Sequence, residues 1–352
     1  MQNDTLKQFV EDINAIREYI KYINLVNNIE VSTAVSGDTA LVEFRDHLRS
    51  FGVSKKIFEY KSITISLYGI LEKHIGIWIK EYISHLPKII NNYNDLPRKF
   101  REDHFELSVK LLGLIGEKKH AKYESIKKES VLAKLNSCIE KPSDFQLNSD
   151  AFYLRSGNLK HAKIAEALTY LDIKLTSSLK IIGQRPDGFL RDRFSNIENK
   201  GEELFRLIDD LVTRRNDIAH GEDIDNILNI REFNEYVDFL EGYGSAVFQT
   251  LLEKMNEFEA KFLYEKIDDV LGIYKNGSVL CFKIENNEIR IGDYIIVNLL
   301  DGGFIKREIL EIQKDKEKFD RLSIQDSKDI GIDVGNGISQ GQTFYIRSQI
   351  AV

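Results

Sequence analysis

Apolar residues in the first three quarters of the chain recur at helical spacing. In the segment ITISLYGILEKHIGIWI, one face of a predicted helix collects residues at three- and four-residue steps: Ile63, Leu67, Ile70, His74 and Ile77. Pro97 is placed to open another helix, because proline fits the first helical turn. The pattern therefore predicts helices from about residue 4 to about residue 264.

The pattern changes after Lys266. Short runs rich in β-branched residues, such as SVLCFKI and YIIVNLL, alternate with pairs of turn-forming residues: Asn276-Gly277, Asn286-Asn287, Gly292-Asp293, Gly302-Gly303 and Asn336-Gly337. An Asn-Gly pair between two such runs is typical of a β-hairpin. Roughly six strands in the remaining segment predict a small closed barrel, because closure removes exposed sheet edges. The expected fold class is α+β, with an all-α domain at 1–264 and an all-β barrel at 265–352.

Composition and charge narrow the class of protein. With 352 residues, 42% hydrophobic content and a net charge of −7, the chain fits a protein of two domains without a global basic excess. Any contact with nucleic acid must therefore come from a local patch. The basic segment 116–134 is expected to be a solvated helix, with contact to a phosphate backbone as the alternative.

The cysteines and the apolar runs bear on the compartment. Cys138 and Cys281 lie far apart, which argues against a disulfide framework and a cysteine-based zinc site and fits a reducing cytoplasm. The stretch MQNDTLKQFVEDI lacks the basic start and apolar core of a secretory signal. No apolar run approaches the ~20 residues of a membrane-spanning helix. We therefore expect a cytoplasmic protein with no membrane partner.

One predicted helix carries an arginine on its apolar face. At about 100° per residue, the buried stripe consists of Leu204, Ile208, Leu211 and Ile218. Arg215 falls in the middle of this stripe, whereas Arg214 lies off it and is expected to be solvated. A guanidinium on an apolar face is costly unless it meets an anion or a satisfied interface. The structural alternative is an arginine that extends to solvent or pairs with a carboxylate.

A histidine follows at the end of the same helix. His220 precedes Gly221, which is placed to close the helix as its C′ glycine. Five residues separate by about 140° on a helix, so Arg215 and His220 converge only if the helix loosens at Ala219–Gly221 or if two copies face each other. RNA cleavage without a metal needs a base, an acid and a cation, and one histidine cannot be base and acid at once. Two protomers would bring two histidines and two arginines into one cleft.

Two other arginine–histidine pairs are interpreted as structural. They join Arg98 to His104 and Arg155 to His161. A Gly-Asn pair at 157–158 is expected to break the helix between the members of the second pair. Both histidines lie on apolar stripes, where a hydrogen-bonded core histidine is the commoner outcome.

The stretch LVTRRNDIAHGED resembles the signature of the HEPN superfamily, in which an arginine precedes a histidine by four to six positions. Three segments, 61–83, 152–173 and 202–222, resemble its RiboL-PSP-HEPN-like branch. HEPN proteins are helical, usually dimeric, and many are metal-independent endoribonucleases of toxin or antiviral systems. The resemblance implies that Arg215 and His220 are catalytic, that Asn216 supports them and that no metal or cofactor is needed. Glu72 is implied as a further polar partner.

The predicted strands resemble the second domain of elongation factor Tu and related translational GTPases. The similar segments are 270–297, 307–334 and 341–346, with an Ile-x-x-Gly-Asp turn and a late Gly-x-x-Phe. The chain contains no Gly-x-x-x-x-Gly-Lys-Ser/Thr loop, so nucleotide hydrolysis is not expected. In translation factors such barrels contact the acceptor end of tRNA, and this fold-level analogy hints at tRNA or the ribosome as the target.

Three functional hypotheses follow. The first is an endoribonuclease, acting as a homodimer in defence or as a toxin, with the β region as a targeting or sensing module. The second is a catalytically inactive dimeric scaffold or sensor that binds RNA or protein. The third is a toxin in a two-gene pair, silenced by nucleotidyl modification and by an antitoxin partner.

Overall fold

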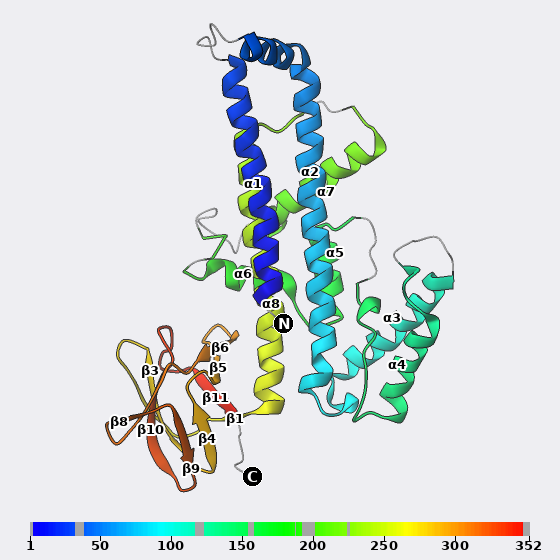
Figure 1. The fold of residues 1–352 in the computed structure, drawn as a ribbon. Helices are drawn as coiled ribbons and strands as arrows, with labels where there is room; N and C mark the ends of the chain where they lie inside the picture. Colours follow the sequence, from blue (N-terminus) through cyan, green and yellow to red (C-terminus); the bar gives the residue numbers. More distant parts are fainter. Residues whose placement is uncertain are drawn as a thin grey trace. The chain divides into compact units, whose positions relative to one another are not determined.

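The computed structural model describes residues 3–31, 39–116, 123–153, 158–186, 188–191, 201–223 and 226–347. Helices occupy most of the chain before residue 264 (Figure 1). The α-helices are α1 Asn3–Val31, α2 Thr39–Ile89, α3 Arg98–Gly116, α4 Lys128–Glu140, α5 His161–Thr169, α6 Leu175–Gln184, α7 Arg206–His220 and α8 Ile230–Leu263. Short 3₁₀ helices include η1 Tyr93–Asp95, η3 Ser149–Ala151 and η4 Gly201–Phe205. The all-α character predicted for this region is confirmed.

The basic segment is not one helix. Helix α3 ends at Gly116 and α4 begins at Lys128, and residues 124–127 between them form a turn and irregular chain. The helix expected over 116–134 was therefore wrong for this part, and residues 117–122 lie outside the described ranges. Helix α3 itself starts directly after Pro97, whose carbonyl accepts a hydrogen bond from the Arg101 N–H.

The remainder of the chain forms antiparallel sheets. The strands are β1 Tyr264–Lys266, β2 Val270–Tyr274, β3 Val279–Ile284, β4 Asn287–Arg290, β5 Tyr294–Asn298, β6 Phe304–Glu308, β7 Glu311–Lys314, β8 Glu317–Phe319, β9 Arg321–Ile324, β10 Lys328–Asp333 and β11 Thr343–Arg347. They pair in the orders β1-β11-β5-β6, β2-β3-β10-β7-β8 and β4-β9. The change from helix to strand falls between Leu263 and Tyr264, a few residues before Lys266, after which the sequence pattern changes.

The predicted closed barrel was wrong. The three sheets are separate hydrogen-bonded sets, and none closes on itself within the described residues. The physical reason lies in the turns. Asn276-Gly277 joins β2 to β3 and Gly302-Gly303 joins β5 to β6, and both connect paired strands. The pairs Asn286-Asn287, Gly292-Asp293 and Asn336-Gly337 instead lead from one sheet to another.

The chain divides into two compact units. One comprises Met1–Glu81, Glu102–Lys128 and Asn148–Thr250, and the other comprises Tyr82–Arg101, Glu129–Leu147 and Leu251–Val352. In the second unit, Asn256 of α8 donates to the Phe304 carbonyl over 2.9 Å and Glu259 pairs with Lys306 over 2.5 Å. A domain boundary between residues 264 and 265 stays a prediction.

A buried histidine joins α1 to α2 in the first unit. The Nε2 atom of His74 lies 2.8 Å from Oδ2 of Asp12, and the Lys73 amine lies 2.9 Å from the same oxygen. Burial opposes ionisation of Asp12, but hydrogen bonds from His74, Lys73 and Gln8 lower its pKa to about 2. His74 is 1% exposed, as its place on the apolar stripe predicts.

The two histidines interpreted as structural are hydrogen-bonded. His104 is fully buried, and its Nε2 accepts the Asn148 N–H over 3.1 Å. The ring of His161 lies 3.0 Å from the Tyr243 hydroxyl and 2.9 Å from the Thr176 hydroxyl, and it stacks on Phe205. Burial lowers the pKa of His161 to about 4, against the opposing charge of Asp209. The structural interpretation is confirmed for both, while Arg155 lies outside the described residues.

His161 should make the stability of the protein depend on pH. Its pKa is lowered to about 4 in the folded chain, whereas a histidine in an unfolded chain titrates near 6.5. Between these values the unfolded chain binds a proton that the folded chain does not, so the free energy of unfolding should fall as pH drops from 6.5 to 4. The full loss is about 3 kcal/mol. Urea unfolding at pH 7.5 and pH 5 measures it. His161→Gln, which does not titrate, should reduce the difference, and an unchanged difference would contradict the assignment.

Candidate functional site

The predicted site lies at the C-terminal end of α7. The helix remains α-helical through His220, and Gly221 follows in the left-handed region with φ of 72°. The Gly221 N–H donates to the Ile218 carbonyl and the Glu222 N–H donates to the Asp217 carbonyl. These two bonds form a Schellman motif, in which glycine adopts positive φ without steric cost. The predicted C′ role of Gly221 is confirmed.

Arg215 occupies the predicted face of α7 and is half-buried there. Ile208 and Leu211, on the same stripe, are at most 1% exposed. The guanidinium carbon of Arg215 lies 4.8 Å from the centroid of the Tyr68 ring on α2, in cation–π geometry. No carboxylate among the described residues pairs with it. The face of an aromatic ring attracts a cation but leaves the N–H donors available for an anion.

Asn216 links Arg215 to a segment distant in sequence. Its side-chain oxygen accepts from Nη1 of Arg215 over 3.0 Å, and its amide nitrogen donates to Oδ1 of Asn158 over 2.7 Å. Asn158 lies just before α5. The bonds orient the amide of Asn216 and the guanidinium of Arg215 together.

His220 takes no part in the hydrogen bonds among Arg215, Asn216 and Asn158. It is exposed at the last position of α7, and its ring makes no hydrogen bond within the ranges that the structure describes. The helix does not loosen at Ala219, so the angular separation of about 140° from Arg215 persists. Convergence of Arg215 and His220 through a second copy of the chain stays a prediction.

The expectation that Arg214 is solvated was wrong. Its Nε donates to Oδ2 of Asp210 over 2.6 Å, and Nη1 donates to the Tyr60 hydroxyl and the Asn226 carbonyl. The Tyr236 hydroxyl donates to the same Asp210 oxygen. Burial opposes the charge, but bonds to Tyr60 and Asp210 raise the pKa of Arg214 further.

The reason for this error is geometric. A helical wheel gives the direction of Cβ, but an arginine side chain is long enough to reach across to α2 and to the chain after α7. Only 15% of the Arg214 side chain is exposed. The spacing of Asp210 and Arg214, four residues apart, was a usable indication, because such pairs face each other on a helix.

Tyr68 and Asn158 were not predicted as site residues from the sequence, and Glu72 has a different role from the one expected. The backbone carbonyl of Glu72 accepts from the Tyr153 hydroxyl over 3.0 Å. The structure places its side chain in no hydrogen bond or ion pair with Arg215, Asn216 or His220. Asn158 was interpreted only as part of a helix-breaking pair, and no local pattern indicated its bond to a residue 58 positions away.

The described ranges hold no cluster of three or more histidine, cysteine, aspartate or glutamate side chains arranged for a metal ion. None of the helices in these ranges combines the length and apolar character needed to cross a membrane.

The similarity to a solved structure is too weak to show a shared fold. A flavohemoglobin from Malassezia yamatoensis, solved with bound FAD and heme, is 13% identical. The similarity covers 72% of this chain and 64% of the flavohemoglobin chain, which is less than two thirds of it. The TM-score of 0.15 is too low to carry an argument. No curated protein matches the chain.

Comparison with protein families gives a clear match. The RiboL-PSP-HEPN family model covers residues 11–253, which include α7 and the residues that contact it. The model ends before the strands, so the resemblance of the β region to elongation factor Tu stays a prediction. Because the match extends over more than half of the sequence, the chain belongs to the RiboL-PSP-HEPN family.

Proposed function

We propose that the protein is an HEPN-type endoribonuclease that uses Arg215, Asn216 and His220 and needs no metal. The observation that carries this proposal is the state of Arg215, which is half-buried on Tyr68 and bonded to Asn216 without a carboxylate partner among the described residues. An arginine held this way retains its charge and its donors for a phosphate. Membership of the HEPN family supports a nuclease or RNA-related function.

RNA cleavage without a metal gives separate roles to Arg215 and His220. A base removes the proton of a ribose 2′-hydroxyl, O2′ forms a bond to phosphorus and the bond from phosphorus to O5′ breaks. An acid protonates O5′, which gives a 2′,3′-cyclic phosphate and a 5′-hydroxyl end. Arg215 stabilises the charge that develops on the phosphorane oxygens. His220 supplies the imidazole, and a second His220 from a partner protomer supplies the other proton transfer.

The biological setting is part of the proposal. We place the enzyme in the cytoplasm as a toxin or antiviral effector that acts on RNA, with tRNA as one target and an antitoxin or sensor protein as a partner. The alternative is a catalytically inactive dimeric scaffold. One observation favours this alternative: within a single chain, no contact joins His220 to Arg215 in the described residues.

The first test is cleavage of RNA by the purified full chain. Wild type should cut total RNA in EDTA and leave 5′-hydroxyl and 2′,3′-cyclic phosphate ends. His220→Ala should lose at least about a hundredfold in rate, because general acid–base catalysis contributes about 10²–10⁴. Sequencing of RNA ends measures both. Equal cleavage by both proteins would contradict the catalytic role of His220, and cleavage by neither would favour the scaffold.

The second test separates the neighbouring arginines. Arg215→Ala should slow cleavage by a factor that corresponds to about 3–4 kcal/mol of lost transition-state stabilisation. The free energy of unfolding should change little. Arg215→Lys should restore little, since an ammonium cannot bridge two phosphate oxygens. Arg214→Ala should instead lower the free energy of unfolding by about 2 kcal/mol, because Asp210 and Tyr60 lose a charged partner. Rates per folded molecule and urea midpoints distinguish the two. An unfolded Arg215→Ala variant would make Arg215 structural.

The third test concerns the composite site. At micromolar concentration the protein should sediment as a dimer, and Ala219→Cys at the exposed end of α7 should give a covalent dimer with a short bis-maleimide. Lys7→Cys, on the exposed part of α1, is the control and should crosslink much less. A monomeric species that cuts RNA at the full rate would overturn the composite arrangement.

A further inference from the structure

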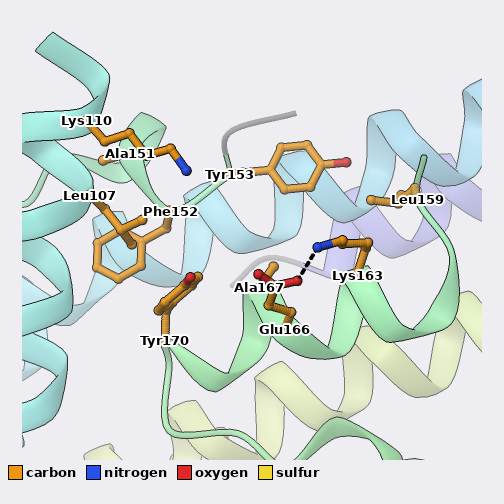
Figure 2. A pocket seen from close by; sticks show the side chains of 10 residues that line it. All are labelled: Leu107, Lys110, Ala151, Phe152, Tyr153, Leu159, Lys163, Glu166, Ala167 and Tyr170. Carbon is orange, nitrogen blue, oxygen red and sulfur yellow. Dashed lines mark hydrogen bonds and ion pairs between the residues drawn. The ribbon is translucent and has the colours of Figure 1, made fainter. Parts of the chain in front are cut away.

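A small cavity opens beside the candidate site in the first unit. Its volume is about 180 Å³, and its walls combine aromatic and charged side chains: Phe152, Tyr153, Tyr170, Lys110, Lys163 and Glu166 (Figure 2). Pockets for drug-sized ligands span about 300–1,000 Å³. The cavity therefore fits one small ring system and not a whole nucleotide or cofactor.

The wall on the α2 side is rigid. The Tyr153 hydroxyl donates to the Glu72 carbonyl over 3.0 Å. Its ring lies directly against Gly76, where an added Cβ would come within 2.6 Å of the ring. Phe152 stacks on the buried His104 with 9° between the ring planes. Phe152 and Tyr153 are 2% and 7% exposed, so they form a fixed wall, and the half-buried Tyr170 offers the ring surface on which a base can stack.

The opposite wall, from α5, is polar. Lys163 and Glu166 pair over 2.6 Å, and Tyr170 follows at the end of the helix (Figure 2). Lys110, on α3, is exposed at the rim. The pair presents a donor and an acceptor to the edge of a bound ring. The positive charge of Lys110 at the rim attracts an attached phosphate.

Two connections join the cavity to Arg215 and Asn216. Leu159 lines the cavity, and the preceding residue, Asn158, is the partner of Asn216. On α2, Tyr68 contacts Arg215 and Glu72 holds Tyr153. Residues four apart on a helix are about 6 Å apart along its axis. The two α2 positions that contact Arg215 and Tyr153 are therefore about one helical turn apart.

We propose that this cavity binds the base of an unpaired nucleotide adjacent to the cleaved phosphate, so that the substrate is RNA with a single-stranded stretch at the cut. This inference rests on the proposed function. Proteins recognise unpaired RNA by stacking splayed bases on aromatic side chains and by contacting their edges. A base-paired nucleotide cannot enter, because its base is stacked within the helix.

The test uses a probe that cannot be cleaved. A single-stranded oligonucleotide with 2′-O-methyl riboses and one 2-aminopurine lacks the attacking hydroxyl, and its fluorescence is quenched when the 2-aminopurine stacks. The full-length protein should quench the probe and bind it about tenfold more tightly than the same sequence as a duplex. Tyr170→Ala should remove most of the quenching and weaken binding about tenfold, which equals about 1.4 kcal/mol. Tyr170→Phe should keep both.

Two further variants serve as a control and as a second test of the cavity. Tyr22→Ala removes a tyrosine that is 58% exposed on α1 and should bind like wild type. Lys110→Glu, at an exposed position, should weaken binding severalfold and decides the matter if Tyr170→Ala does not fold. Unchanged binding and quenching in Tyr170→Ala, or no binding by wild type, would overturn the cavity proposal.

The cavity and the nuclease can fail separately. If Tyr170→Ala weakens probe binding while His220→Ala still cleaves RNA, the cavity stands and the assigned catalytic histidine falls. If His220→Ala loses cleavage while Tyr170→Ala binds the probe normally, the nuclease stands and the base-binding cavity falls.

Discussion

The guanidinium of Arg214 bonds to Asp210 on its own helix, to Tyr60 on α2 and to the carbonyl of Asn226 after the helix ends. Through these bonds the last turns of α7 are fixed against α2. The position of Arg215 over Tyr68 follows from this attachment, because neighbouring residues on a rigid helix cannot move independently. The first arginine of the pair thus positions the helix, and the second is left with its donors free of a carboxylate among the described residues.

The sequence predicted those features that depend on local periodicity. The apolar face of α7, the closing role of Gly221 and a switch to strands within a few residues of Tyr264 all follow from residue spacing within a short window. The partners of Arg214 and Asn216 could not be predicted this way, because Tyr60 and Asn158 are brought near only by packing of distant segments. A helical wheel also carries no information about side-chain length, which is why Arg214 was misplaced.

In the β region, too, the sequence predicted local turns but not the pairing of distant strands. Turn-forming pairs marked five of the ten connections between the described strands, and both Asn276-Gly277 and Gly302-Gly303 join paired strands. The turn between β7 and β8, at Asp315 and Lys316 with φ of 51° and 69°, has a sequence that does not stand out as a hairpin turn. Pairing over long separations, such as β3 with β10, is decided by packing and not by turn spacing. Closure of a barrel depends on such pairings, so it could not be inferred from turns alone.

Because Tyr153 packs against Gly76, the neighbouring cavity cannot widen toward α2. Tyr153 has no room to retreat toward α2, since even a methyl group at position 76 would overlap its ring. A ligand larger than one ring would have to displace the other walls, which belong to α3 and α5. Because Asn158 precedes α5 and bonds to Asn216, a displacement of α5 would pull on the amide that orients Arg215. The size of what enters the cavity would then be transmitted mechanically to the guanidinium.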